Sequence, residues 1–155
     1  MKSRSLARRL AVAVLYEAEI KEASPLEVFR ARSRTDWQMP EEPDDERGPA
    51  SGFKGSPASE VLDYVYILVA GVDEGRERID ALIAASAEHW GIERMPVVDA
   101  NVLRVGAFEL SCRLDVPVAV VINEAVELAK TLSTEDSGRF VNGVLGRVAE
   151  TRSVR

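Results

Sequence analysis

Cysteine and histidine are almost absent from this 155-residue sequence, which contains one of each, Cys112 and His89. A single cysteine excludes a disulfide within the chain, and the two residues leave neither a set of zinc ligands nor an evident Cys–His nucleophile pair. The glycine-rich loops GxGxxG and GxxxxGK[ST], which hold nucleotide phosphates, are also missing. Glu124 and Glu127 lie three residues apart, and we interpret them as part of a solvated helix face. We therefore expect no enzyme activity, no cofactor and no metal.

Long hydrophobic runs are missing as well. No apolar stretch approaches the roughly 18 residues that a membrane-spanning helix needs. The basic start and the apolar stretch behind it suggest a secretion signal, but Glu17 and Glu19 follow at once and no small-residue cleavage site closes the stretch. We expect a soluble protein that does not contact a membrane and that resides in the cytoplasm.

Charge is distributed unevenly along the chain, whose net charge is -6. The first ten residues carry four basic side chains (Lys2, Arg4, Arg8 and Arg9) and no acidic one. Residues 35–60 carry seven acidic residues against Arg47 and Lys54. A basic end on an acidic body is a sign of nucleic-acid contact. A solvated chain end with no ligand gives the same pattern, and charge alone leaves both interpretations open.

Apolar residues recur at three- and four-residue steps along most of the sequence, which is the spacing of one helix face. Four helices are expected over residues 4–22, 25–32, 97–113 and 117–132. Two more are expected between about residue 58 and residue 86, separated by a break in the region of Gly71 and Gly75. A last helix is expected after a capping residue within 133–136. The segment 97–113 is apolar on nearly all sides and should be the central helix. The β-branched run Val116–Ile122 continues into a helical stripe, which favours a helix over a strand. The sequence therefore predicts an all-α fold of about six to seven helices.

Two features of this pattern concern the chain's surface. In the first helix Leu15 and Ile20 are expected to widen the buried face, whereas the arginines of its first turns are expected to project outward. Residues 35–58 are acidic and rich in proline and glycine, which predicts a flexible loop. The alternative is a partner-binding segment anchored by Trp37 or Phe53.

A second group of residues with RNA-binding chemistry lies near the end of the chain. Arg139, Phe140 and Asn142 precede Gly143, and Phe140 is one position off the apolar stripe. Bases stack on aromatic rings and phosphates pair with arginine, so this group suits single-stranded RNA. Packing of Phe140 at the edge of the core is an equally good explanation. The small glycine would let a ligand or another backbone approach closely.

Several segments together resemble the NusB family of transcription antitermination factors. The similar segments are residues 121–130 (VINEAVELAK), 135–145 (EDSGRFVNGVL), 102–110 (VLRVGAFEL), 115–117 (DVP) and the first helix from Ala7 to Tyr16. The resemblance covers the whole chain except about residues 33–58. It implies a single domain over 1–155, built as two packed helical bundles.

The resemblance also implies a function. Members of this family bind the boxA element of ribosomal RNA leader transcripts together with NusE, the ribosomal small-subunit protein S ten, in a complex with other Nus factors and RNA polymerase. The residues that would face RNA are Lys2, Arg4, Arg8, Arg9, Arg104, Arg139, Phe140 and Asn142. The residues that would face the partner are Tyr16, Ile20 and Asp99. Gly138 and the thin basic cluster depart from the family pattern, so the help of NusE should matter more here.

Two other functions remain to be weighed. NusB-like domains also form the RNA-binding front of rRNA cytosine methyltransferases. That function needs a cofactor domain and a catalytic cysteine further along, and we expect neither because the sequence ends at Arg155. The second alternative is a homodimer in which the basic face is covered by self-association.

Overall fold

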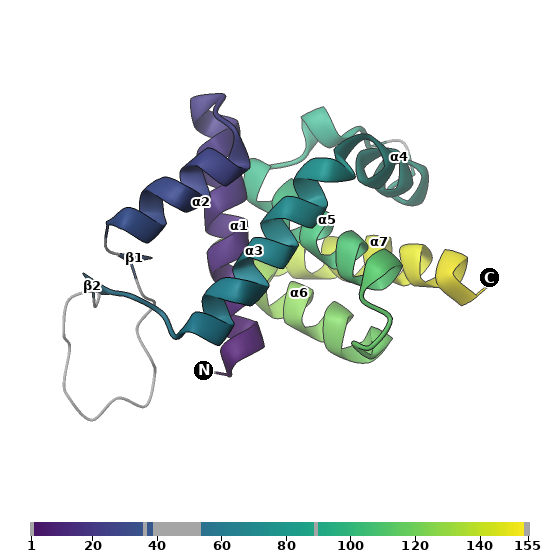
Figure 1. Cartoon of the computed structure of the whole chain (residues 1–155). Coiled ribbons are helices and arrows are strands. Elements are labelled where there is room, and N and C mark those ends of the chain that lie inside the picture. The colour runs from purple at the N-terminus through teal and green to yellow at the C-terminus, as the bar shows by residue number, and fades with distance from the viewer. Residues whose placement is uncertain (1, 36, 39–53, 89, 154–155) are drawn as a thin grey trace.

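The computed structural model describes residues 2–35, 37–38, 54–88 and 90–153. These residues form seven α-helices, one short 3₁₀ helix and one pair of two-residue strands (Figure 1). The elements are α1 (Ser3–Lys21), α2 (Pro25–Arg34), β1 (Trp37–Gln38), β2 (Lys54–Gly55), α3 (Ser59–Glu74), α4 (Arg76–Ser86), η1 (Ile92–Arg94), α5 (Val97–Cys112), α6 (Val118–Leu132) and α7 (Glu135–Ser153). The all-α prediction is confirmed. In the described part of the chain no helix is long and apolar enough to cross a membrane.

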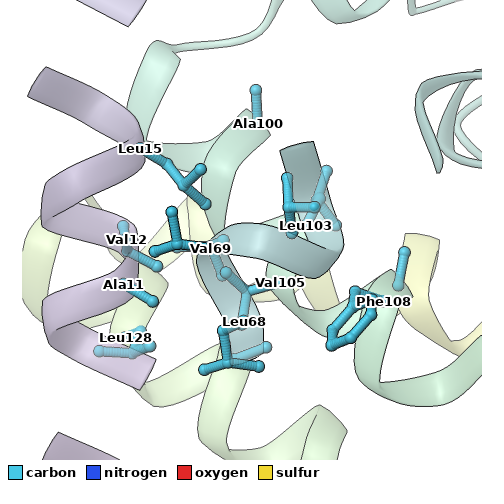
Figure 2. Packing of buried hydrophobic residues seen from close by; sticks show 14 of the residues in the cluster. Ala11, Val12, Leu15, Leu68, Val69, Ala100, Leu103, Val105, Phe108 and Leu128 are labelled. Carbon is cyan, nitrogen blue, oxygen red and sulfur yellow. The ribbon is translucent and has the colours of Figure 1, made fainter. Parts of the chain in front are cut away.

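Helix α5 is the centre of the molecule. Every residue from Asp99 to Leu110 is buried, as the sequence predicts for a helix that is apolar on nearly all sides. Helices α1, α2 and α3 pack against one another on one side of it, and α6 and α7 pack on the other, with α4 against α5 and α7. Figure 2 shows the resulting core, in which Val12, Val69 and Val105 come from three different helices.

The break between α3 and α4 falls within the glycine region that the sequence indicates. Gly75 ends α3 and Arg76 begins α4. Gly71 lies inside α3, where a Cβ atom would overlap the Phe108 ring of α5. Glycine is therefore needed at position 71 for close packing rather than for the turn.

Helices α6 and α7 begin where their capping residues predict. Pro117 precedes α6, and the run Val116–Ile122 continues into that helix instead of forming a strand. Thr134 precedes α7, and its Oγ1 accepts a hydrogen bond of 3.0 Å from the backbone N–H of Ser137. The inward stripe of α7 is the predicted one, with Val141, Val144, Leu145 and Val148 all buried.

The predicted loop over residues 35–58 is too broad at its ends. Trp37 pairs with Gly55 in a short antiparallel ladder. The Trp37 side chain is 1% exposed and packs edge-on against Phe29 at a centroid distance of 6.0 Å. Trp37 therefore belongs to the core and does not anchor an external partner. Phe53 and the acidic stretch 39–53 lie outside the described residues.

We expect Gly71→Ala to lower the free energy of unfolding by about 1–3 kcal/mol, because its methyl group would overlap the Phe108 ring. The matched control is Gly146→Ala in α7, where the new methyl group would meet no neighbouring side chain or helix within 4 Å. That change should stabilise by about 0.5–1 kcal/mol, since alanine favours a helix over glycine. Urea unfolding measures both. Equal effects of the two substitutions would contradict the packing role of Gly71.

Candidate nucleic-acid interface

Arg8 is not a surface residue. It is 3% exposed, and its Nε and Nη2 donate hydrogen bonds of 2.7 and 2.9 Å to the two carboxylate oxygens of Glu109 in α5. The Tyr64 hydroxyl of α3 donates to the same carboxylate at 2.7 Å. The expectation that Arg8 projects outward is wrong, because its guanidinium is held inside the bundle by a bidentate pair that joins three helices.

The protonation of this buried group follows from its contacts. Burial alone would lower the pKa of Arg8, but its hydrogen bond to Glu109 and the charge of Glu109 raise that pKa above the usual value. Burial, followed by the hydrogen bond to Glu109, raises the pKa of Tyr64 to about 12. At neutral pH Arg8 is therefore charged and the tyrosine hydroxyl is a donor.

Arg104 is also buried, at 1% exposure, in the middle of α5. Its Nε donates to Asp80 of α4 at 2.8 Å, and its Nη1 donates to Glu19 of α1 at 3.2 Å and to the Asn101 side chain at 2.9 Å. Burial lowers the pKa of Arg104, but the hydrogen bonds and the charges of Asp80 and Glu19 together outweigh it, so that pKa is raised. The expected RNA-facing position of Arg104 is therefore corrected: this arginine ties α1 and α4 to α5.

The basic groups that do reach the surface surround the start of α1. Lys2 and Arg4 are exposed, and both line a groove of about 450 Å³ between α1 and the beginning of α6. Asp115, Pro117 and Asn123 form part of its other wall. A second, smaller hollow of about 120 Å³ continues along α6, where Arg9 is half-buried. These are positions from which cations can contact phosphates.

Residues of α7 form a separate, largely apolar pocket of about 290 Å³. Phe140 and Trp90 meet there with ring centroids 6.4 Å apart, and Trp90 is 55% exposed. Phe140 is half-buried, so it packs at the edge of the core and still lines the pocket. Arg139 and Asn142 are exposed nearby on α7, and Arg139 is paired with Asp136.

Asp99 lines the same pocket and does not lie on an open face. It is 3% exposed, and one of its oxygens accepts a hydrogen bond of 2.7 Å from Ser137. The other oxygen has no hydrogen-bond partner among the described residues. A partner can reach Asp99 only through the pocket.

The other two partner-facing candidates, Tyr16 and Ile20, are exposed at 42% and 58% one turn apart on α1. The expected burial of Ile20 is thus wrong.

The face of α6 leads from the basic residues of α1 toward the group on α7 that the sequence places far away. The groove at the start of α1 and the hollow beside Arg9 share Ser5, Glu124 and Glu127. The hollow reaches Thr131 near the end of α6. The pocket of Phe140 includes Thr134, three residues further along the chain, and has no lining residue in common with the hollow. We call the groove, the hollow and this pocket together the α6 track. Helix α6, which carries the first two, is about 22 Å long at 1.5 Å per residue.

Sequence reasoning missed three residues of this surface. The sequence marks Trp90 only as the neighbour of His89, which lies outside the described residues. It marks Arg113 only as the last residue of a predicted helix and Asp115 only as part of the turn that follows, and no sequence signal shows that the two lie beside Arg4. Gly143 was expected to admit a close approach, but no neighbouring part of the described chain lies within 4 Å of a Cβ position there.

We expect Arg8→Ala to lower the free energy of unfolding by about 3–5 kcal/mol, because it leaves the Glu109 carboxylate buried without its cation. Urea unfolding at neutral pH measures the loss. The control Arg9→Ala removes a half-buried neighbour and should change stability by less than about 1 kcal/mol. The double variant Arg8→Met/Glu109→Gln should recover part of the loss. A stable Arg8→Ala protein would contradict the buried pair.

Comparisons with known proteins agree with this architecture. The model of the NusB family matches residues 5–150. The transcription antitermination protein NusB of Saccharopolyspora erythraea is 46% identical over 151 residues, which are 96% of this chain and 88% of the relative. T. maritima NusB is 32% identical, with a TM-score of 0.72 over 97% of this chain and 93% of that one.

A second solved structure holds the antitermination factors NusB and NusE in complex with dsRNA. It matches with a TM-score of 0.73 and 27% identity, over 97% of this chain and 98% of that one. The Saccharopolyspora relative is named as an antitermination protein and not as an enzyme, in agreement with the expectation from the sequence. The fold, the family match and the full-length relatives lead to one conclusion: the chain belongs to the NusB family.

Proposed function

We propose that this protein binds RNA jointly with NusE, the ribosomal small-subunit protein S ten, and supports antitermination in the cytoplasm. Its RNA would be the boxA element of ribosomal RNA leader transcripts, within a complex that includes other Nus factors and RNA polymerase. The observation that carries the proposal is the α6 track, in which exposed basic residues lie along α6 and an aromatic pocket lies past the end of that helix. The similar structure of NusB with NusE and dsRNA supports it.

The α6 track offers two kinds of RNA contact. Lys2, Arg4 and Arg9 lie at its first part, where they would hold backbone phosphates and fix the position of the strand. Phe140 and Trp90 lie at its end, where an unstacked base can pack against their rings. Asn142 and Arg139 are exposed beside that pocket and would contribute hydrogen bonds.

The two buried arginines no longer belong to the proposed contact set. Arg8 and Arg104 are 3% and 1% exposed and hold carboxylates of other helices. Arg8 lines the groove, but to turn toward a phosphate it would have to leave the buried Glu109 carboxylate unpaired at a cost of several kcal/mol. Arg104 would have to give up its bonds to the half-buried carboxylates of Glu19 and Asp80. Their contribution to binding would be indirect, because they set the position of α1.

Acidic side chains along the α6 track limit the affinity of the protein alone. Glu124, Glu127 and Asp136 line the track, and each would repel a nearby phosphate. NusE would therefore be needed to hold the RNA. Its contact surface would include Tyr16 and Ile20, two apolar side chains that are exposed without cover on α1. Asp99 would contact NusE only if a side chain of NusE entered the pocket that Asp99 lines.

We expect boxA RNA to be retained better by this protein with NusE than by either protein alone. Fluorescence anisotropy with a boxA oligonucleotide measures the affinities, and light scattering on the same samples reports dimers. The variant Lys2→Ala/Arg4→Ala should weaken binding and reduce the slope of log K against log salt by about 1.4, the value for two phosphate contacts on a single strand. The charge-matched control Lys21→Ala/Arg30→Ala lies away from the α6 track and should bind normally.

Two results would contradict the proposal. One is an affinity for boxA RNA that NusE does not raise. The other is equal weakening by the two double variants, which would mean that only the net charge of the protein matters and not the groove at the start of α1.

A further inference from the structure

Two residues of the turn between α5 and α6 lie beside Arg4, and neither is among the RNA-facing or partner-facing residues that the resemblance implies. Arg113 follows the last residue of α5, and Asp115 lies two positions later. The Asp115 carboxylate stands between two guanidinium groups: one oxygen is 3.5 Å from Nη2 of Arg4, and the other is 3.6 Å from Nε of Arg113. We call these three residues the Arg4–Asp115–Arg113 cluster.

The ring of Tyr64 lies next to both arginines of the cluster. The guanidinium carbon of Arg4 is 4.7 Å from the ring centroid, and that of Arg113 is 5.6 Å from it. The Tyr64 hydroxyl is fixed by its hydrogen bond to Glu109, which the buried Arg8 also holds. Cations are attracted to an aromatic face, so a ring that cannot move keeps the two arginines close together.

The ion pairs within the cluster are loose. At 3.5 and 3.6 Å they exceed the usual distance of a charge-assisted hydrogen bond. Arg113 Nε is buried and has no hydrogen-bond partner among the described residues. The side chains of Arg4 and Asp115 are 47% and 57% exposed, and Arg4 and Asp115 both line the groove at the start of α1. Two cations, one exposed and one partly buried, thus converge on one weakly held anion at the edge of the groove.

We propose that Arg4 and Arg113 form a subsite for one backbone phosphate of bound RNA, and that Asp115 occupies this subsite in the free protein. The proposal rests on the proposed RNA-binding function and adds Arg113 and Asp115 to it. A phosphate offers more acceptor oxygens than a carboxylate and matches the planar fork of arginine. Bound phosphate would displace the Asp115 carboxylate, whose charge would then oppose binding.

The proposal is tested on the full chain with NusE and a boxA oligonucleotide, by anisotropy over a range of salt concentrations. Arg113→Ala should weaken binding about three- to tenfold and lower the salt slope by about 0.7, as expected for one lost phosphate contact on a single strand. Asp115→Asn should strengthen binding about two- to fivefold, because it removes a repulsive charge and keeps the side chain's size.

Matched controls lie on α2. Arg30→Ala and Glu27→Gln change the net charge by the same amounts outside the cluster, and both should leave the affinity within about twofold, as for rim charges far from a ligand. Thermal melting shows whether Arg113→Ala is folded. Arg113→Lys is a second variant that keeps the charge and the fold but loses the planar fork, so it should weaken binding less than alanine does.

Each outcome decides the proposal. Weaker binding of Arg113→Ala and tighter binding of Asp115→Asn support it. If the wild-type protein binds RNA and both cluster variants bind as the α2 controls do, the subsite is overturned and the proposed function stays intact. Absence of wild-type binding overturns both. If inorganic phosphate at matched ionic strength displaced the RNA, and Arg113→Ala abolished this effect, the cluster would be a site for free anions and its assignment to RNA would be wrong.

Discussion

The bidentate pair between Arg8 and Glu109 is the contact on which the rest of the surface depends. It places the start of α1 against the end of α5, while Glu19 near the end of α1 accepts hydrogen bonds from Arg104 in the middle of α5 and from Asn101 nearer its start. The two helices therefore run antiparallel, with a polar contact in each half of α1. Because a buried charge without its partner is costly, the register of α1 on α5 is strongly specified. That register decides which side chains of α1 face outward, including Arg4 at one end and Tyr16 and Ile20 at the other.

The arginines of this chain consequently serve two purposes. Arg8 and Arg104 are structural cations inside the bundle, whereas Arg4 lines the groove, Arg9 lines the hollow beside it and Arg113 is partly exposed in the turn after α5. Both structural cations hold α1 in position, and Arg8 also holds the Glu109 carboxylate that fixes the Tyr64 hydroxyl. In the proposed function, the interior pairs thus shape the RNA surface without touching RNA. The opposing acids along α6 explain why a chain of this family would bind RNA best with a partner.

Much of the fold could be predicted from the sequence, because apolar spacing reports directly on helices and their buried faces. The central position of α5, the break near Gly75 and the helical character of Val116–Ile122 all followed from it. Polar residues were harder to place. Arg8 was expected to project from the first helix, and the resemblance alone placed Arg104 on the RNA face. Periodicity does not reveal that Glu109 and Asp80 lie where they can pair with them. Asp99 and Trp90 owe their roles to a pocket between α7, η1 and α5, which no local pattern encodes.

The division of the arginines is tested most directly by the side-chain Nε–H signals of arginine in NMR spectra, recorded with NusE before and after addition of boxA RNA. If the account is right, the signals of Arg8 and Arg104 are visible in the free protein, exchange slowly with water and stay in place when RNA binds. The signals of Arg4, Arg9 and Arg113 shift. Movement of the Arg8 or Arg104 signal as large as that of Arg4 would contradict the account, because it would show that RNA draws a buried cation out of its pair.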